Sequence, residues 1–238
     1  MVKKLRTFSL LVLCLCISGI SQAQKEKINT DRPDQSDGVY TVSKGSFQLE
    51  NGLMIADRVF ENNLLLRYGV GRTTELRLLV DAGKEQDNKG VKPITFSVKQ
   101  RIVQQRNILP AISFSGYLSY GKLASKDFQS DTWGSQLTLV FENELTDRFT
   151  LGYNVGTTHR FDNLILTAGL GYDATEKLSA YLEYFSTIAS ALSEHNIDAG
   201  LLYLVHPQMQ LDIAVGHSLF ASEDRLFTTF GISYRFDR

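Results

Sequence analysis

The segment WGSQLTLVFENEL, residues 133–145, gives the clearest indication of the fold. Bulky apolar side chains alternate with mostly polar or charged ones: Trp133, Leu137, Leu139, Phe141 and Leu145 on one face, and Gly134, Gln136, Thr138, Val140, Glu142 and Glu144 on the other. Because successive side chains of a β-strand point to opposite faces, the pattern predicts a strand with one apolar and one polar face.

Strand-like runs of this kind recur toward the C-terminus, with turn signals and no convincing helical period between them. We predict twelve runs, over residues 45–58, 62–70, 74–83, 92–104, 110–121, 131–145, 148–159, 162–173, 177–187, 196–205, 208–217 and 226–236. Tight turns, such as LTDRF at 145–149, alternate with longer loops, such as KLASKDFQSD at 122–131. Short turns at one end and longer loops at the other are typical of outer-membrane barrels, whose short turns lie in the periplasm.

The polar face of the runs is too small and too charged to be a soluble core. In the run 92–104, the outward residues are Ile94, Phe96, Val98 and Ile102, and the inward ones are Thr95, Ser97, Lys99 and Arg101. A soluble barrel needs a bulky apolar interior, whereas glycine, serine and charged residues would fill this one, with no apolar track in the lumen. We therefore expect an all-β, transmembrane antiparallel β-barrel of about 12 strands, with lipid outside and both termini periplasmic.

Aromatic residues gather at the ends of the predicted strands. One end has Phe47, Tyr68, Phe149, Tyr172, Tyr203, Tyr234 and Phe236, and the other has Phe60, Tyr120, Trp133, Phe161, Tyr184 and Phe227. Two aromatic belts at the membrane interfaces would give this distribution. The general preference of strands for aromatic residues is the alternative explanation.

The first 23 residues read as a targeting segment. Lys3, Lys4 and Arg6 precede an apolar run at 8–17, and Ser21-Gln22-Ala23 resembles a signal-peptidase site. An apolar run of about 10 residues is too short for a transmembrane anchor, which needs roughly 20. We expect a cleaved signal peptide at 1–23, a periplasmic N-terminal segment at 24–44 that forms a partial plug, and the barrel at 45–238.

Cleavage changes the composition of the chain. Both cysteines, Cys14 and Cys16, leave with the signal peptide, so the mature chain of about 215 residues is not a disulfide scaffold. Loss of the three basic residues from a total of 25 leaves 22 against 26 acidic ones, a formal charge of −4. This charge gives no argument for nucleic-acid binding. The expected partners are the lipid bilayer of the outer membrane of a Gram-negative bacterium and a small solute of unknown identity.

Ten charged residues are predicted to point into the periplasmic half of the lumen: Glu50, Arg67, Glu75, Arg77, Lys99, Arg101, Glu142, Glu144, Asp212 and Arg235. Five are acidic and five are basic, so ion pairing is expected, because an unpaired charge in a narrow lumen is costly. The charges form either a salt-bridged brace that seals the barrel or a porin-like constriction that filters solutes. Glu183 and Asp198 are predicted to lie closer to the outer mouth.

Other chemistry is sparse in the sequence. His159, His195, His206 and His217 lack the spacing of metal ligands, and we expect neither a metal nor a cofactor. The adjacent pair His217-Ser218 is the only hint of an outer-membrane lipase-type enzyme, and it lacks a third partner. We expect no enzymatic activity.

The N-terminal motifs carry a family resemblance. TDRPDQSDG at 30–38 and KGSFQLENG at 44–52, with the terminal Tyr234-Arg235-Phe236, resemble outer-membrane proteins described as transporters and named for the MetA pathway of phenol degradation. Asp237 and Arg238 extend beyond the usual final aromatic residue. The resemblance implies an outer-membrane barrel with a transport role, and we expect Asp31 and Arg32 to hold the N-terminal segment against the lumen.

Three functions follow from these observations. A channel or transporter for small solutes is favoured, with a non-conducting structural or surface-interaction barrel and a lipase-type enzyme as alternatives. The sequence indicates neither the substrate nor the oligomeric state.

Overall fold

The structure is a computed structural model that describes residues 27–158, 161–190, 193–220 and 226–237. Its strands are β1 (Phe47–Ala56), β2 (Val59–Gly69), β3 (Thr74–Glu85), β4 (Asn88–Val91), β5 (Thr95–Val103), β6 (Ala111–Tyr120), β7 (Trp133–Glu144), β8 (Phe149–Thr158), β9 (Asn163–Asp173), β10 (Leu178–Ala189), β11 (Glu194–His206), β12 (Met209–Leu219) and β13 (Leu226–Phe236). Two 3₁₀ turns, η1 (Gly121–Leu123) and η2 (Lys126–Phe128), connect β6 to β7. In the described ranges, no helix has the length and apolarity that crossing a membrane requires. The predicted signal peptide, residues 1–23, lies outside the described residues.

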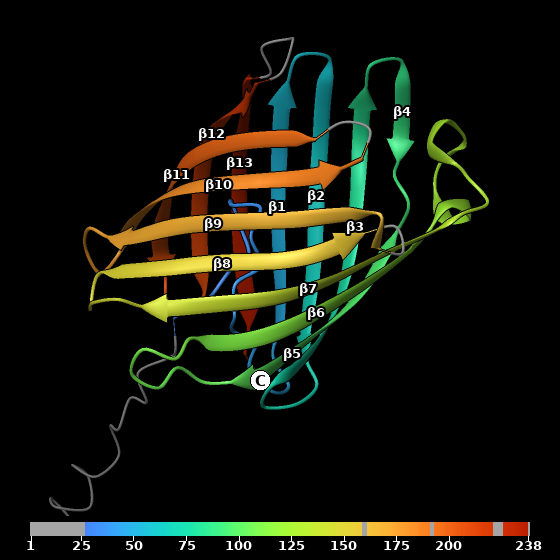
Figure 1. Cartoon of the computed structure of the whole chain (residues 1–238). Coiled ribbons are helices and arrows are strands. Elements are labelled where there is room, and N and C mark those ends of the chain that lie inside the picture. The colour runs from blue at the N-terminus through green and yellow to red at the C-terminus, as the bar shows by residue number, and fades with distance from the viewer. Residues whose placement is uncertain (1–26, 159–160, 191–192, 221–225, 238) are drawn as a thin grey trace, which may run out of the picture.

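The strands form one closed antiparallel barrel (Figure 1). Neighbours in sequence pair all the way round, and the β1–β13 and β2–β3 pairings complete the wall. Among the described strands, β4 pairs with β3 alone and is a short extension at the rim. The other twelve strands confirm the predicted barrel. The stretch 84–90, predicted as an irregular loop, instead completes β3 and begins β4.

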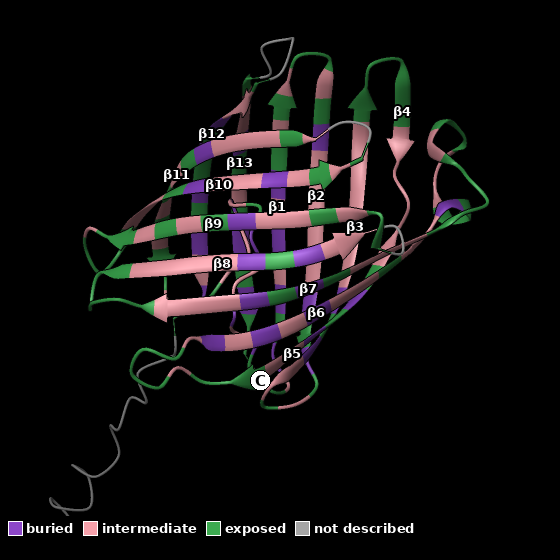
Figure 2. Cartoon of the chain, in the orientation of Figure 1, coloured by how far each residue is buried: buried purple, intermediate pink, exposed green. Residues whose placement is uncertain are grey.

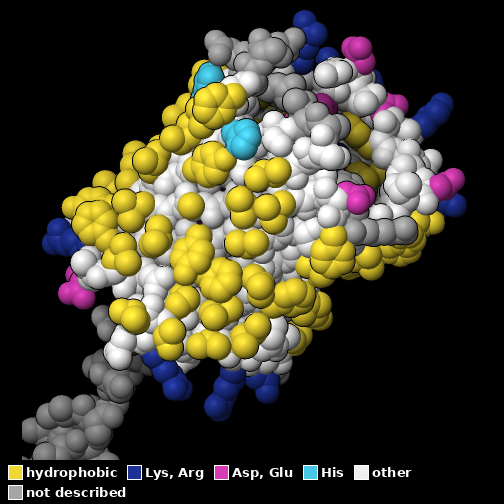
Figure 3. Space-filling model, viewed as in Figure 1, with side chains coloured by type: hydrophobic (Ala, Val, Ile, Leu, Met, Phe, Trp, Pro, Cys, Tyr) yellow, Lys and Arg dark blue, Asp and Glu magenta, His cyan; other side chains and the backbone are white. Residues whose placement is uncertain are grey.

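Side chains alternate across the wall as the sequence predicts. On β7, Val140 is fully buried inside, while its neighbour Leu139 is 43% exposed on the outer surface. Figure 2 shows buried residues in the middle of most strands, and Figure 3 shows hydrophobic side chains spread over the outer wall. An apolar surface around a polar interior is the arrangement that a lipid environment stabilises.

One stacked pair lies where an aromatic belt is predicted, and one predicted belt residue lies elsewhere. Tyr120 and Trp133 stack at the long-loop end, with 4.3 Å between ring centroids. Phe227, however, faces the interior, so its prediction as a belt residue is wrong. It shares a face of β13 with buried Thr229, and its ring centroid lies 6.2 Å from that of Phe185.

The interior is also less uniformly polar than the sequence predicts. Leu65 and Leu79 face each other across β2 and β3 and line a cavity together with Met54. The runs Leu64–Leu66 and Leu78–Val80 are apolar at successive positions, so both faces of these strands are apolar there. The expectation that the lumen has no apolar track is therefore wrong for the part of the wall beside the long loops.

Candidate functional site

The N-terminal segment, residues 27–46, enters the barrel and returns at the short-turn end. The backbone N–H of Ile28 donates to Pro207 in the β11–β12 turn at 2.7 Å, and that of Gly45 donates to Gly69 at the end of β2, also at 2.7 Å. Between these anchors the chain lies inside the barrel, where Figure 1 shows it in blue. Residues 31–37 cross the lumen and are here called the septum. The sequence of the septum has no strand or helix period, so its contacts with the wall fix its path.

Asp31 is the centre of an ion-pair network on one wall. Its carboxylate accepts hydrogen bonds from Lys99 Nζ at 3.0 and 3.1 Å, lies 3.6 Å from Arg67 Nη1 and forms an ion pair with Arg77. These three cations project from β5, β2 and β3, and the side chain of Asp31 is only 5% exposed. Asp37 extends the network through Arg77 Nη1 at 2.9 Å.

Two glutamates of the wall hold the same cations in place. Arg67 donates to Glu50 at 2.8 Å and to Glu75 at 3.0 Å, and Arg77 donates to Glu75 at 2.8 Å. The glutamates also bind the N-terminal segment: Glu50 accepts from the backbone N–H of Asp31 at 3.0 Å, and Glu75 accepts from that of Val42 at 2.6 Å. Burial of these charges is tolerated because each has partners of opposite charge and further hydrogen bonds.

A second contact surface, on the opposite side of β1 from the ion-pair network, receives Arg32. Its Nη2 lies 3.2 Å from Asp212 Oδ1 on β12, and its guanidinium occupies the space above Gly52 and Gly231. A Cβ on Gly52 would lie 2.0 Å from Arg32 Cζ, and one on Gly231 would lie 2.5 Å from Arg32 Nε. Because these two glycines are direct neighbours across β1 and β13, they form one receptor for the arginine.

The third surface that contacts the septum lies on β9 to β11. Among the described residues, no basic side chain takes part in these contacts. Glu183 accepts from the backbone N–H of Gln35 at 2.8 Å and from the hydroxyl of Ser36, whose Oγ lies 2.6 Å from the hydroxyl oxygen of Thr167. Asp198 lies directly across from Glu183, on β11. Burial raises the pKa of Asp34 in the septum well above its usual range, and the negative charges of Glu183, Asp198 and Glu50 raise it further.

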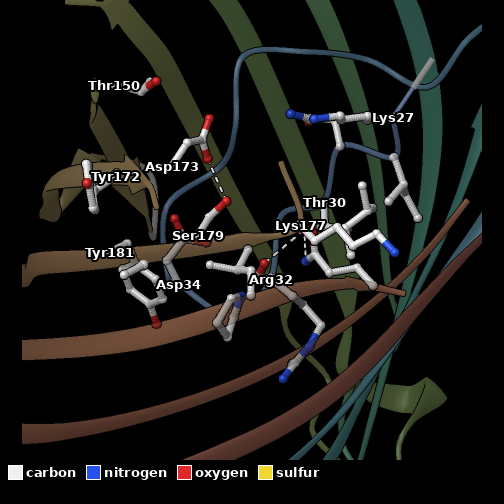
Figure 4. A pocket seen from close by; sticks show the side chains of 18 of the residues that line it. Lys27, Thr30, Arg32, Asp34, Thr150, Tyr172, Asp173, Lys177, Ser179 and Tyr181 are labelled. Carbon is white, nitrogen blue, oxygen red and sulfur yellow. Dashed lines mark hydrogen bonds between the residues drawn. The ribbon is translucent and has the colours of Figure 1, made fainter. Parts of the chain in front are cut away.

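The septum separates cavities on its two sides. A cavity of about 370 Å³ reaches Arg148, Glu176 and Lys177 at the short-turn end, and Figure 4 shows Arg32 and Asp34 among its lining residues. Two cavities of about 410 and 290 Å³ lie toward the long loops and share lining residues with each other. Arg32, Pro33 and Asp34 line cavities on both sides, so the septum is the wall between them.

The remaining charged residues that were predicted for the lumen lie nearer the short-turn end, away from the septum. They are Arg101, Glu142, Glu144 and Arg235. Arg101 lies over the ring of Tyr40, 5.7 Å from its centroid, and Glu144 accepts from the hydroxyl of Tyr40 at 3.2 Å. Glu142 lines the cavity at the short-turn end. Arg235 donates to Asp237 at 2.6 Å and to the carbonyl of Lys27 at 3.1 Å. These residues border the entrance of the N-terminal segment.

Several contacting residues escaped the sequence prediction. Asp37 and Tyr117, which donates to Asp37, belong to the network around Arg77, and Gly52 and Gly231 receive Arg32. The only sequence signal was the density of charged residues in TDRPDQSDG, which does not say where in the lumen they bind.

Neither a metal site nor the lipase-type pair finds support in the geometry. Within the described part of the chain, no group of three or more His, Cys, Asp or Glu side chains could hold a metal ion. His217 and Ser218 are successive residues of β12, so their side chains point to opposite faces, and the Ser218 hydroxyl donates to Asn196 at 2.7 Å.

Several solved structures share the fold of this chain. The fold is similar to that of the KdgM porin in complex with disordered oligogalacturonate (TM-score 0.63, 14% identity, 80% of this chain and 99% of that chain). It is also similar to an outer-membrane channel from Pseudomonas putida F1 (TM-score 0.62, 11% identity, 87% and 100%) and to the NanC porin (TM-score 0.61, 8% identity, 79% and 98%). No curated protein sequence matches this chain.

The sequence itself matches one family model from residue 30 to residue 236, a range that includes the septum and every barrel strand. This protein therefore belongs to the family described as "Putative MetA-pathway of phenol degradation".

Proposed function

We propose that this protein is an outer-membrane channel for small solutes, closed at rest by its own N-terminal segment. The observation that carries the proposal is the septum: residues 31–37 lie between the cavity at the short-turn end and the two cavities toward the long loops. A barrel that only braced the membrane would need no such cavities on both sides. Family membership and the fold shared with porins support the same reading.

The proposal includes an orientation and a route of export. Residues 1–23 would act as a cleaved signal peptide, and the short-turn end would face the periplasm, as in other bacterial barrels. Both anchors of the N-terminal segment, at Pro207 and Gly69, would then lie on the periplasmic side. The segment could leave the lumen toward the periplasm without threading through the barrel.

Ion pairs between the septum and the lumen wall would hold the channel in this closed state. Asp31 and Arg32 each connect the septum to the wall through buried or nearly buried charges, as the side-chain exposures of 5% and 13% show. Ion pairs of this kind need both partners, because one charge left alone in the lumen is strongly unfavourable. Withdrawal of the segment would therefore require that water or solute replace these partners.

Single-channel recording in planar bilayers tests the proposal. The mature protein should show rare or small openings, and a variant lacking residues 24–43 should show large and stable ones, because the septum is gone while Glu50 and Glu75 still partner Arg67. Folding of both proteins is checked by circular dichroism. If the folded deletion variant conducts no better than the mature protein, the septum is not the barrier, and the sealed structural barrel becomes the better account.

A further inference from the structure

We infer that the long-loop side of the lumen, with the septum docked, admits cationic solutes in preference to anionic ones, and that the substrates of the channel are small organic amines. The inference rests on the proposed channel function and names the class of substrate for the same lumen. Its basis is an excess of carboxylates from the septum to the long-loop end.

The cations of the lumen wall between the septum and the long-loop end are already committed to partners. Arg67 and Arg77 bind Glu50, Glu75 and Asp37, and Lys99 binds Asp31. Toward the long loops, Lys92 pairs with Glu61 and Glu85. None of these four basic groups is thereby left over for an anionic solute.

Several carboxylates, in contrast, have no ion pair within the described part of the chain. They are Asp34 in the septum, Asp81 on β3, Glu183 on β10 and Asp198 on β11. Asp81 accepts one hydrogen bond, from Asn63 at 3.0 Å. Asp198 is only 2% exposed, and its Oδ1 has no hydrogen-bond partner in the described residues. A buried carboxylate oxygen without a partner is costly, and a positively charged donor would relieve it.

The cavities show the same asymmetry. The two on the long-loop side are lined by six carboxylates and two basic groups: Asp31, Asp34, Asp37, Glu50, Glu61 and Asp81 against Arg32 and Arg77. The cavity at the short-turn end is lined by four of each: Asp34, Glu142, Asp173 and Glu176 against Lys27, Arg32, Arg148 and Lys177. A solute arriving from the long loops thus meets a negative vestibule, which concentrates cations and repels anions.

The wall of this vestibule also indicates the body of the solute. Met54, Leu65 and Leu79 line the same cavity of about 290 Å³ as Glu61 and Asp81. An ammonium group beside the carboxylates and a short hydrocarbon chain against the leucines would satisfy both parts of the wall. A metal ion would use only the carboxylates, and a neutral hydrocarbon only the apolar side chains.

Reversal potentials in planar bilayers test this inference, with butylammonium chloride and potassium butyrate as probes of equal length and opposite charge. We expect butylammonium to permeate at least fivefold better than butyrate in the mature protein. The double variant Glu61→Gln/Asp81→Asn should reduce this ratio at least twofold. The matched control Asp173→Asn/Glu176→Gln removes two carboxylates from the short-turn cavity and should leave the ratio nearly unchanged.

The outcomes separate this inference from the channel function. Conduction with no cation preference, or with free passage of butyrate or galacturonate, overturns the inference and leaves the channel intact. Absence of current in both the mature protein and the variant lacking residues 24–43 overturns both. If the double variant does not fold, the mature protein still provides a test: its cation preference should rise from pH 5 to pH 8 as carboxylates ionise, and a constant ratio below twofold contradicts the inference.

Discussion

Replacing Gly231 by alanine should release the septum without changing any charge. The new methyl group would lie 2.5 Å from Arg32 Nε and 2.5 Å from Asp212 Oδ2, closer than real Cβ contacts allow. The wall of β13 is held by strand pairing on both sides, so the side chains of Arg32 and Asp212 must move apart from the new methyl group. Asp212, whose side chain is fully buried, would then lose its cation.

The size of the effect follows from the loss of a buried partner. Leaving one member of a buried ion pair unpaired costs about 3 kcal/mol, the lower end of the usual range, which suits a lumen that water can reach. Each 1.4 kcal/mol changes an equilibrium about tenfold, so the population with an undocked septum should rise roughly a hundredfold. Single-channel recording should show this as a matching increase in open probability.

Gly152→Ala provides the matched control. Gly152 also lies on an inward-facing position, on β8, but a Cβ there would meet nothing within 4 Å. The same amino-acid change should therefore leave open probability at the wild-type level. The reasoning is refuted if Gly231→Ala opens no more often than Gly152→Ala while both proteins are folded.

Three further predictions follow from other contacts. Because docking of the septum raises the pKa of Asp34, docking is coupled to the uptake of a proton. Docking is therefore strongest at low pH and weakens as pH rises through the raised pKa. Open probability should increase with pH, and Asp34→Asn should flatten this dependence. Asp31→Asn removes the shared partner of three cations and should lower the melting temperature measured by circular dichroism, whereas an unchanged value would show that the network adds no stability. Trp133→Ala removes a ring that stacks on Tyr120 with 4.3 Å between centroids. The loss of stacking should reduce the free energy of unfolding from lipid by about 1 kcal/mol, in addition to the effect of the lost apolar contact area. Urea titrations measure this change, with Leu123→Ala as a surface control.

The barrel could be predicted because each strand carries its own signal. Leu139 and Val140 show the limit of that signal: both are apolar, and only the period of the surrounding residues places one outside and the other inside. Phe227 is misplaced for a different reason: its position at a strand end suggests a belt residue, whereas the period that places Phe230 outside places Phe227 inside.

The septum could not be predicted in the same way, because nothing local determines its path. Asp31 lies beside Lys99 only after β1 to β5 have assembled, and the two residues are 68 positions apart in the chain. The receptor for Arg32 is still less visible, since Gly52 and Gly231 contribute only the absence of a side chain. The family motif drew attention to Arg32, but only the folded barrel shows which glycines make room for it.

A reversible disulfide bond between the septum and the wall tests whether the septum closes the channel. Ser36 Oγ and Thr167 Oγ1 are 2.6 Å apart, and the mature chain has no cysteine of its own once the segment with Cys14 and Cys16 is removed. When oxidised, the variant Ser36→Cys/Thr167→Cys should conduct less than the wild-type protein. It should regain conductance within the same recording when a reductant is added. Each single cysteine variant should be insensitive to both treatments. An oxidised, locked protein that conducts as well as the reduced one would show that solutes pass the barrel without moving the septum, and would contradict this account.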